Sequence, residues 1–272
     1  MFYIIMQITN STTNFTSRNI DIRRADDIVR HANRVIPAFN PNYAAENWKI
    51  FQKSPLKKFY FEEKFKKLIF AMRNQYHSYS EQHPTFYLDL FDKVKSRKIC
   101  NCNEKAFITL GTLFANGYDN AMKIGLEMEI GAYDKTSGKC IATKIIPIDH
   151  TTVLSTMNNP NRVEINKTVV LDGWLNKAMT VSEAKKEYER FVPKRKIEAA
   201  IQELQDELRA SSRMPLQNRF ARNANSQNPL DKYEFRKSIE FLEDIRFKDE
   251  KAHDFGQEVL RKYPQIKLNQ LI

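Results

Sequence analysis

The sequence contains little cysteine and no long hydrophobic run, and each absence excludes a class of protein. Its three cysteines, Cys100, Cys102 and Cys140, are too few and odd in number for a disulfide framework, which favours a reducing working environment. No stretch approaches the roughly 20 apolar residues that a transmembrane helix needs. The opening residues Met1–Met6 are too few for a standard secretory signal and lack its basic region, so we expect any export to use a specialised system.

The charge of the chain is basic but mixed. Its 44 Lys and Arg residues exceed its 33 Asp and Glu residues by 11. An excess of this sign can favour nucleic acid, anionic membrane or an acidic protein. The basic residues are interleaved with acids, as where Lys57-Lys58 precede Glu62-Glu63, so we do not expect a nucleic-acid partner. Lys194-Arg195-Lys196 and residues 219–222 are basic clusters that fit either a solvated face or contact with an acidic surface.

Residues 1–98 predict a helical region that packs on the part of the chain that follows. Ser54 before Pro55 is typical of a helix start, because the hydroxyl caps the helix and proline suits its first turn. Further helices are predicted within residues 14–36 and 85–95. The helix after Pro55 carries apolar residues at helical spacing, which predicts a face packed in the core: Phe61, Phe65, Leu68, Ile69 and Met72.

The periodicity changes in residues 99–180. Residues 103–114 predict an amphipathic helix, and residues 126–132 alternate between apolar and other side chains, as a half-buried strand does. A second strand is predicted over residues 140–148, and 149–154 either continue it or form a third. After an Asn-rich turn, residues 162–171 predict the last strand. This region therefore predicts a helix followed by an antiparallel meander.

Residues 181–272 predict a helical C-terminal extension that packs on the core or forms a substrate-docking lobe. Thr180 and Glu183 have the spacing of a capping box, and residues 197–208 carry an apolar stripe. Residues 211–229 are rich in Asn, Ser and Arg and predict a loop. Asp231 and Glu234 predict the start of a further helix with four apolar residues on one face: Phe235, Ile239, Leu242 and Ile245.

Three residues in these elements suggest nucleophilic chemistry. Cys102 falls at the predicted start of a helix, where unpaired N–H groups and the helix dipole favour a thiolate. His150 lies at the edge of a strand, and its imidazole can take the thiol proton. Asp172 ends the next strand, and if the two strands pair, its carboxylate can orient the ring. Each residue alone also fits a structural role, but their order and settings together predict a Cys-His-Asp triad.

Three segments carry a resemblance to a known family. Residues 101–106, Asn-Cys-Asn-Glu-Lys-Ala, resemble the Asn-Cys-x-Glu-x-Ala nucleophile motif of transglutaminase-like and papain-like bacterial effectors. Residues 149–154 resemble the histidine strand of these proteins, and residues 169–174 their Val-Val-x-Asp-Pro-Trp element. The chain departs from the family in having Cys100 where many members carry Gly, Gly173 where Pro is common, and a longer connection between the histidine and the aspartate.

The resemblance implies an α+β fold with a papain-like core, in which the nucleophile helix packs on an antiparallel sheet between helical flanks. It implies that Cys102 is the nucleophile, His150 the general base and then acid, and Asp172 the orienting carboxylate, with no cofactor. The backbone N–H of Cys102 and a second group would bind the oxyanion. Three further residues are candidates for support of this site, with Asn74 and Gln75 as oxyanion donors and Trp174 as a shield or core aromatic.

The family includes glutamine deamidase toxins, transglutaminase effectors and related cysteine proteases that are delivered into host cells. The resemblance therefore implies acyl transfer from a glutamine side chain of a host protein in the host cytosol, with proteolysis as the alternative. A non-enzymatic alternative is a zinc-stabilised binding module, whose ligands would be Cys100, Cys102, Cys140 and His150. A helical scaffold that binds a host protein or membrane is a third possibility.

Overall fold

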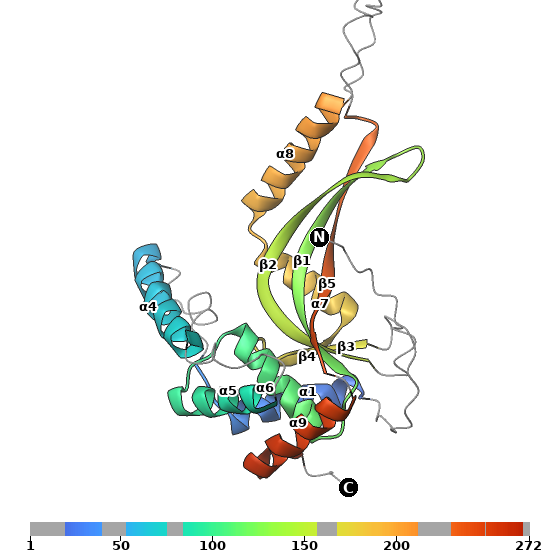
Figure 1. Cartoon of the computed structure of the whole chain (residues 1–272). Helices are drawn as coiled ribbons and strands as arrows, with labels where there is room; N and C mark the ends of the chain where they lie inside the picture. The colour runs from blue at the N-terminus through green and yellow to red at the C-terminus, as the bar shows by residue number, and fades with distance from the viewer. Residues whose placement is uncertain are drawn as a thin grey trace, which may run out of the picture. The chain divides into compact units, whose positions relative to one another are not determined.

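The computed structural model describes residues 20–39, 53–74, 84–156, 168–211, 230–247 and 249–268. Over these residues the fold is α+β, which confirms the predicted class (Figure 1). One antiparallel sheet has the order β4-β3-β2-β1-β5, formed by β1 (Ala121–Asp134), β2 (Cys140–Thr156), β3 (Thr168–Asp172), β4 (Lys177–Thr180) and β5 (Tyr233–Arg246). The chain divides into two compact units, of which the first comprises Met1–Ile124, His150–Ser182 and Glu243–Ile272.

The first unit is built around one buried helix. Its helices are α1 (Ile22–Val35), α4 (Pro55–Asn74), α5 (Pro84–Arg97), α6 (Cys102–Ala115), α9 (Asp249–Lys262) and the 3-10 turn η4 (Pro264–Ile266). Every side chain of α6 except that of Asn103 is buried, and α6 packs against α1, α5, α9 and β3 (Figure 1). At Gly256 of α9 a Cβ atom would lie 2.6 Å from the carbonyl oxygen of Phe114, so only glycine allows this approach. Such burial makes α6 a rigid support for the residue at its start.

Helix α1 connects the N-terminal region to the sheet. The Asp21 carboxylate accepts a hydrogen bond of 2.7 Å from the backbone N–H of Arg24 and so caps the start of α1. The helix then buries Ala25, Ile28, Val29 and Ala32 at helical spacing. On α1 the Asp26 carboxylate accepts a hydrogen bond of 2.9 Å from the backbone N–H of Ala178 in β4. Helix α1, within the predicted region 1–98, therefore packs directly on β4 and on β3, the strand that carries Asp172.

Strands β2 and β3 pair in antiparallel register, as the meander prediction requires. Val153 lies opposite Leu171 and Leu154 opposite Val170, so the end of β3 lies near the His150 part of β2. All five residues of β3 are buried, which suits its apolar sequence. The predicted last strand began at residue 162, and its first six residues lie outside the described part of the chain.

The second unit comprises Gly125–Asp149 and Glu183–Leu242. Its β1–β2 turn is closed by Gly138, whose φ of 69° suits glycine, and by the Asp134 carboxylate, which accepts backbone N–H groups of Thr136 and Ser137. Helix α7 (Val181–Tyr188), the 3-10 turn η2 (Glu189–Phe191) and α8 (Lys194–Ser211) follow along the chain. Helix α8 buries a stripe of three residues, which agrees with the predicted apolar face: Ala200, Leu204 and Leu208.

One predicted helix is wrong. Residues 233–246 form strand β5 beside β1, where the capping pair of Asp231 and Glu234 had predicted a helix. The apolar residues of this stretch fit both periods, since Tyr233, Phe235, Ile239 and Phe241 also follow the two-residue repeat of a strand. Pairing with β1 decides between them. The predicted loop over residues 211–229 lies outside the described residues apart from Ser211, which ends α8. Among the described helices, none is long and apolar enough to cross a membrane.

Candidate active site

Cys102 is the first residue of α6, and local contacts fix the start of this helix. The side chain of Asn101 accepts a hydrogen bond of 2.8 Å from the backbone N–H of Cys102, and the Glu104 carboxylate accepts one of 2.8 Å from the backbone N–H of Asn101. The two side chains form a capping box, which satisfies N–H groups that would otherwise be unpaired at a buried helix end. The Asn-x-x-Glu spacing is visible in the sequence and could have predicted this role.

The structure describes one of the expected oxyanion donors and leaves the side chains of the other candidates undescribed. The backbone N–H of Cys102, expected to bind the oxyanion, donates instead to the Asn101 side chain in this structure. Gln75 and the side chain of Asn74 lie outside the described residues, so their proposed role stays a prediction.

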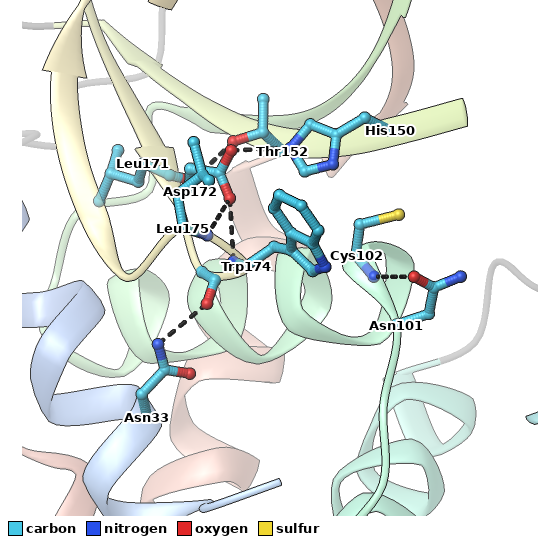
Figure 2. A network of polar contacts seen from close by, with 10 residues as sticks. Asn33, Asn101, Cys102, His150, Thr152, Leu171, Asp172, Trp174 and Leu175 are labelled. Atoms are coloured by element: carbon cyan, nitrogen blue, oxygen red, sulfur yellow. Dashed lines mark hydrogen bonds and ion pairs between the residues drawn. The ribbon is translucent and has the colours of Figure 1, made fainter. Parts of the chain in front are cut away.

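His150 and Asp172 lie side by side, although 22 positions separate them in the sequence. The Nε2 atom of His150 is 2.7 Å from Oδ2 of Asp172 (Figure 2). Both side chains are buried, His150 at 4% and Asp172 at 0% exposure, so water does not weaken the interaction. The pairing of β2 with β3 produces this contact, as the strand order predicted.

The second oxygen of Asp172 is held by the turn that follows it. Oδ1 accepts hydrogen bonds of 2.9 Å from the backbone N–H groups of both Trp174 and Leu175 (Figure 2). The turn spans residues 173–176 and ends at Asn176, whose φ of 57° lies in the left-handed region that Asn tolerates better than most residues. The carboxylate is therefore fixed on both sides, and its orientation toward His150 is set by the backbone.

Cys102 lies beside His150, and its side chain contributes to the raised pKa of the ring (Figure 2). Because Asp172 occupies Nε2, the Nδ1 atom is the ring nitrogen left for the thiol. Burial lowers the pKa of His150, but the charge and hydrogen bond of Asp172, together with those of Cys102, outweigh burial and raise the pKa to about 10. The imidazole is therefore protonated at neutral pH and carries a proton that it can give to a leaving group.

Trp174 packs against the ring of His150. The two ring centroids are 5.3 Å apart and the planes meet at 64°, an edge-to-face arrangement (Figure 2). The indole therefore covers one side of the imidazole close to Asp172. This position agrees with the expected shielding role, and the residue also packs as a structural aromatic.

Gly173 explains one departure from the family pattern. A Cβ atom at this position would lie 2.6 Å from Oγ1 of Thr109 and 3.0 Å from the carbonyl oxygen of Lys105, both on α6. The turn after Asp172 thus lies directly on the nucleophile helix, with no room for a side chain. Glycine at this position brings the carboxylate strand and the cysteine helix together.

The remaining cysteines do not join this site. Cys100 is buried, and burial is the main cause that raises the pKa of its thiol to about 12, so it stays protonated at neutral pH. Cys140 is exposed at the start of β2. Within the described residues no three His, Cys, Asp or Glu side chains gather as a metal site would require. The described positions of Cys100, Cys102, Cys140 and His150 therefore do not support the zinc alternative.

Comparison with protein-family models, with curated protein sequences and with solved structures gives no match for this chain. Function must therefore be argued from the chemistry of the site. A thiol at a capped helix start, an imidazole and a fixed carboxylate can together form a nucleophile and move protons to and from a reacting group. The structure brings Cys102, His150, Asp172 and Trp174 together, and their catalytic roles stay a prediction (Figure 2).

Proposed function

We propose that the chain is a thiol-dependent acyl-transfer enzyme with a papain-like core. The observation that carries this proposal is the contact of the His150 ring with the Asp172 carboxylate, with the Cys102 side chain beside the same ring (Figure 2). The burial of all three side chains supports it further, because charges in a dry site interact strongly. Cys102 is the nucleophile, His150 transfers the proton and Asp172 orients the ring.

The first half of the reaction forms a thioester. The Cys102 thiolate attacks the carbonyl carbon of the acyl donor, and the carbonyl electron pair moves onto oxygen. When the tetrahedral intermediate collapses, the carbon–nitrogen bond breaks. The leaving nitrogen takes the proton that the His150 imidazolium carries, so it departs as a neutral amine or ammonia. His150 is then neutral and can act as a base.

The second half of the reaction depends on the acceptor. Neutral His150 takes a proton from water or from a lysine amine as that group attacks the thioester. Attack by water on a glutamyl thioester gives glutamate, which is deamidation. Attack by the amine gives an isopeptide cross-link. Both routes return the thiolate and the imidazolium, so the same three residues serve either one.

The glutamine side chain is the proposed acyl donor, because residues 101–106 resemble the motif of the deamidase and transglutaminase effectors. By the same resemblance the substrate is a host protein in the host cytosol, reached by a specialised export route. The same three side chains would also serve a cysteine protease, whose leaving group is the amine of a peptide bond. Proteolysis is therefore an outcome that the experiment must separate.

The test is to incubate the purified chain with a host-cell extract and to compare modified peptides by mass spectrometry with those made by Cys102→Ala. Deamidation adds about one dalton at a glutamine, cross-linking joins two peptides, and proteolysis leaves new termini. We expect glutamine modification that is absent with Cys102→Ala, since this variant loses the nucleophile but little volume. New termini alone would replace the proposal by a protease. Equal products from both proteins would exclude Cys102 as the nucleophile.

A further inference from the structure

Two polar residues outside the triad connect the nucleophile helix to the turn that holds Asp172. Lys105 lies one helical turn after Cys102 and is buried at 5% exposure. Its ammonium donates a hydrogen bond to Oδ1 of Asn33 on α1. The Asn33 amide in turn donates a hydrogen bond of 2.9 Å to the carbonyl oxygen of Gly173 and one of 2.8 Å to Oδ1 of Asn176. Figure 2 draws the first of these hydrogen bonds.

The chemistry of the partners fixes the orientation of the Asn33 amide. A lysine ammonium can only donate, and a backbone carbonyl oxygen can only accept. The amide oxygen must therefore face Lys105 and the amide nitrogen must face the turn. One side chain thus binds both ends of residues 173–176, the segment whose N–H groups hold Asp172.

We infer that Asn33 and Lys105 are positioning residues, which fix the turn after Asp172 on α6 and so hold the carboxylate in line with His150. Neither residue touches the thiol or the imidazole in the contacts described, so both act through Asp172. The inference rests on the proposed function, because it assigns them to the same site. Burial lowers the pKa of Lys105, and the hydrogen bond to Asn33 satisfies its buried amino group. Asn33 lies on the N-terminal helix α1, 140 positions before Gly173, and this inference makes it part of the support of the active site.

The test uses the reactivity of Cys102, which needs no substrate. Full-length protein is treated with iodoacetamide at neutral pH, and alkylation of Cys102 is followed over time by peptide mass spectrometry. Fragment spectra separate Cys102 from Cys100. We expect Asn33→Ala and Lys105→Met to slow alkylation at least about tenfold, because a displaced Asp172 no longer orients the imidazole beside the Cys102 sulfur.

Asn116→Ala is the matched control. Asn116 lies at the other end of α6, where its amide bridges the carbonyl oxygens of Thr112 and Ile266 and accepts the N–H of Leu268. This change removes a comparable bridging amide far from the triad along the helix. We expect it to lower the melting temperature about as much as Asn33→Ala and to leave the alkylation rate within about twofold of wild type.

The outcomes distinguish the inference from the proposed function. If wild-type Cys102 reacts no faster than a free thiol, the activated thiol and the inference both fail. If wild type is fast and Asn33→Ala matches Asn116→Ala in both rate and stability, the inference alone is overturned. Should Asn33→Ala fail to fold, Asn33→Asp keeps the size and the Lys105 contact but loses the N–H donors. A wild-type rate in Asn33→Asp would then overturn the inference.

Discussion

The Nε2 atom of His150 lies 2.7 Å from Oδ2 of Asp172, and this contact joins the middle of β2 to the end of β3. It exists because the two strands pair in the register that places Val153 opposite Leu171. The backbone of the next turn fixes the other carboxylate oxygen. A carboxylate held by the backbone on one side therefore contacts the imidazole on the other.

Asp172→Asn should destabilise the fold most at acidic and neutral pH. The pKa of His150 rises from 6.5 to about 10 on folding, so folding favours its protonated form. The stability that comes from this shift is complete below about pH 6.5 and is lost as the pH rises through about 10. Removing the carboxylate should cost about 3 kcal/mol in the free energy of unfolding near neutral pH.

Urea unfolding of wild type and Asp172→Asn at several pH values measures this difference. The gap between the two proteins should shrink as the pH approaches about 10, where wild-type His150 loses its proton. A gap that stays constant or grows with pH would show that His150 and Asp172 are not an ion pair in the folded protein. Activity of the variant should fall at least about 100-fold, because the ring loses its orienting charge.

Gly173→Ala should disturb the site by pushing the turn after Asp172 away from α6. The new methyl group would lie 2.6 Å from Oγ1 of Thr109 and 3.0 Å from a backbone oxygen, so the turn must move away from α6. We expect a loss of about 1–3 kcal/mol in the free energy of unfolding. Gly125→Ala in β1 is the control, because a Cβ atom there meets nothing within 4 Å. Equal stability of the two variants would contradict the close packing of the turn on the helix.

Trp174 should matter through the area of its ring. In Trp174→Ala the side of His150 that the indole covers becomes open to water. We therefore expect the activity of the variant on the substrate protein to fall about tenfold. Trp174→Phe keeps an aromatic face and should retain most of the activity. The comparison is made on initial rates at matched enzyme concentration. A Phe variant as impaired as the Ala variant would instead assign the indole N–H, and not the ring, to the function.

The sequence predicted the positions of the site residues better than it predicted the fold around them. Cys102 at a helix start and the order of His150 and Asp172 follow from local patterns, namely a capping spacing and apolar strands separated by a turn. These patterns constrain residues that are neighbours in sequence or in one hairpin. The sequence therefore predicted which side chains meet, and strand pairing produced the contact.

Contacts between distant segments could not be predicted in this way. Strand β5 satisfies the helical period as well as the strand period, and only its pairing with β1 settles the choice. Asn33 lies 140 positions from Gly173, and nothing near it in the sequence marks it as a partner of that turn.

A pH titration of the His150 ring by NMR tests the central claim most directly. The His150 resonances are assigned by their loss in His150→Gln and followed in wild type and in Asp172→Asn. We predict that His150 stays protonated through neutral pH in wild type, loses its proton near pH 10, and does so at lower pH in Asp172→Asn. A His150 that titrates near the ordinary value of 6.5 in both proteins would contradict the buried thiol–imidazole–carboxylate site.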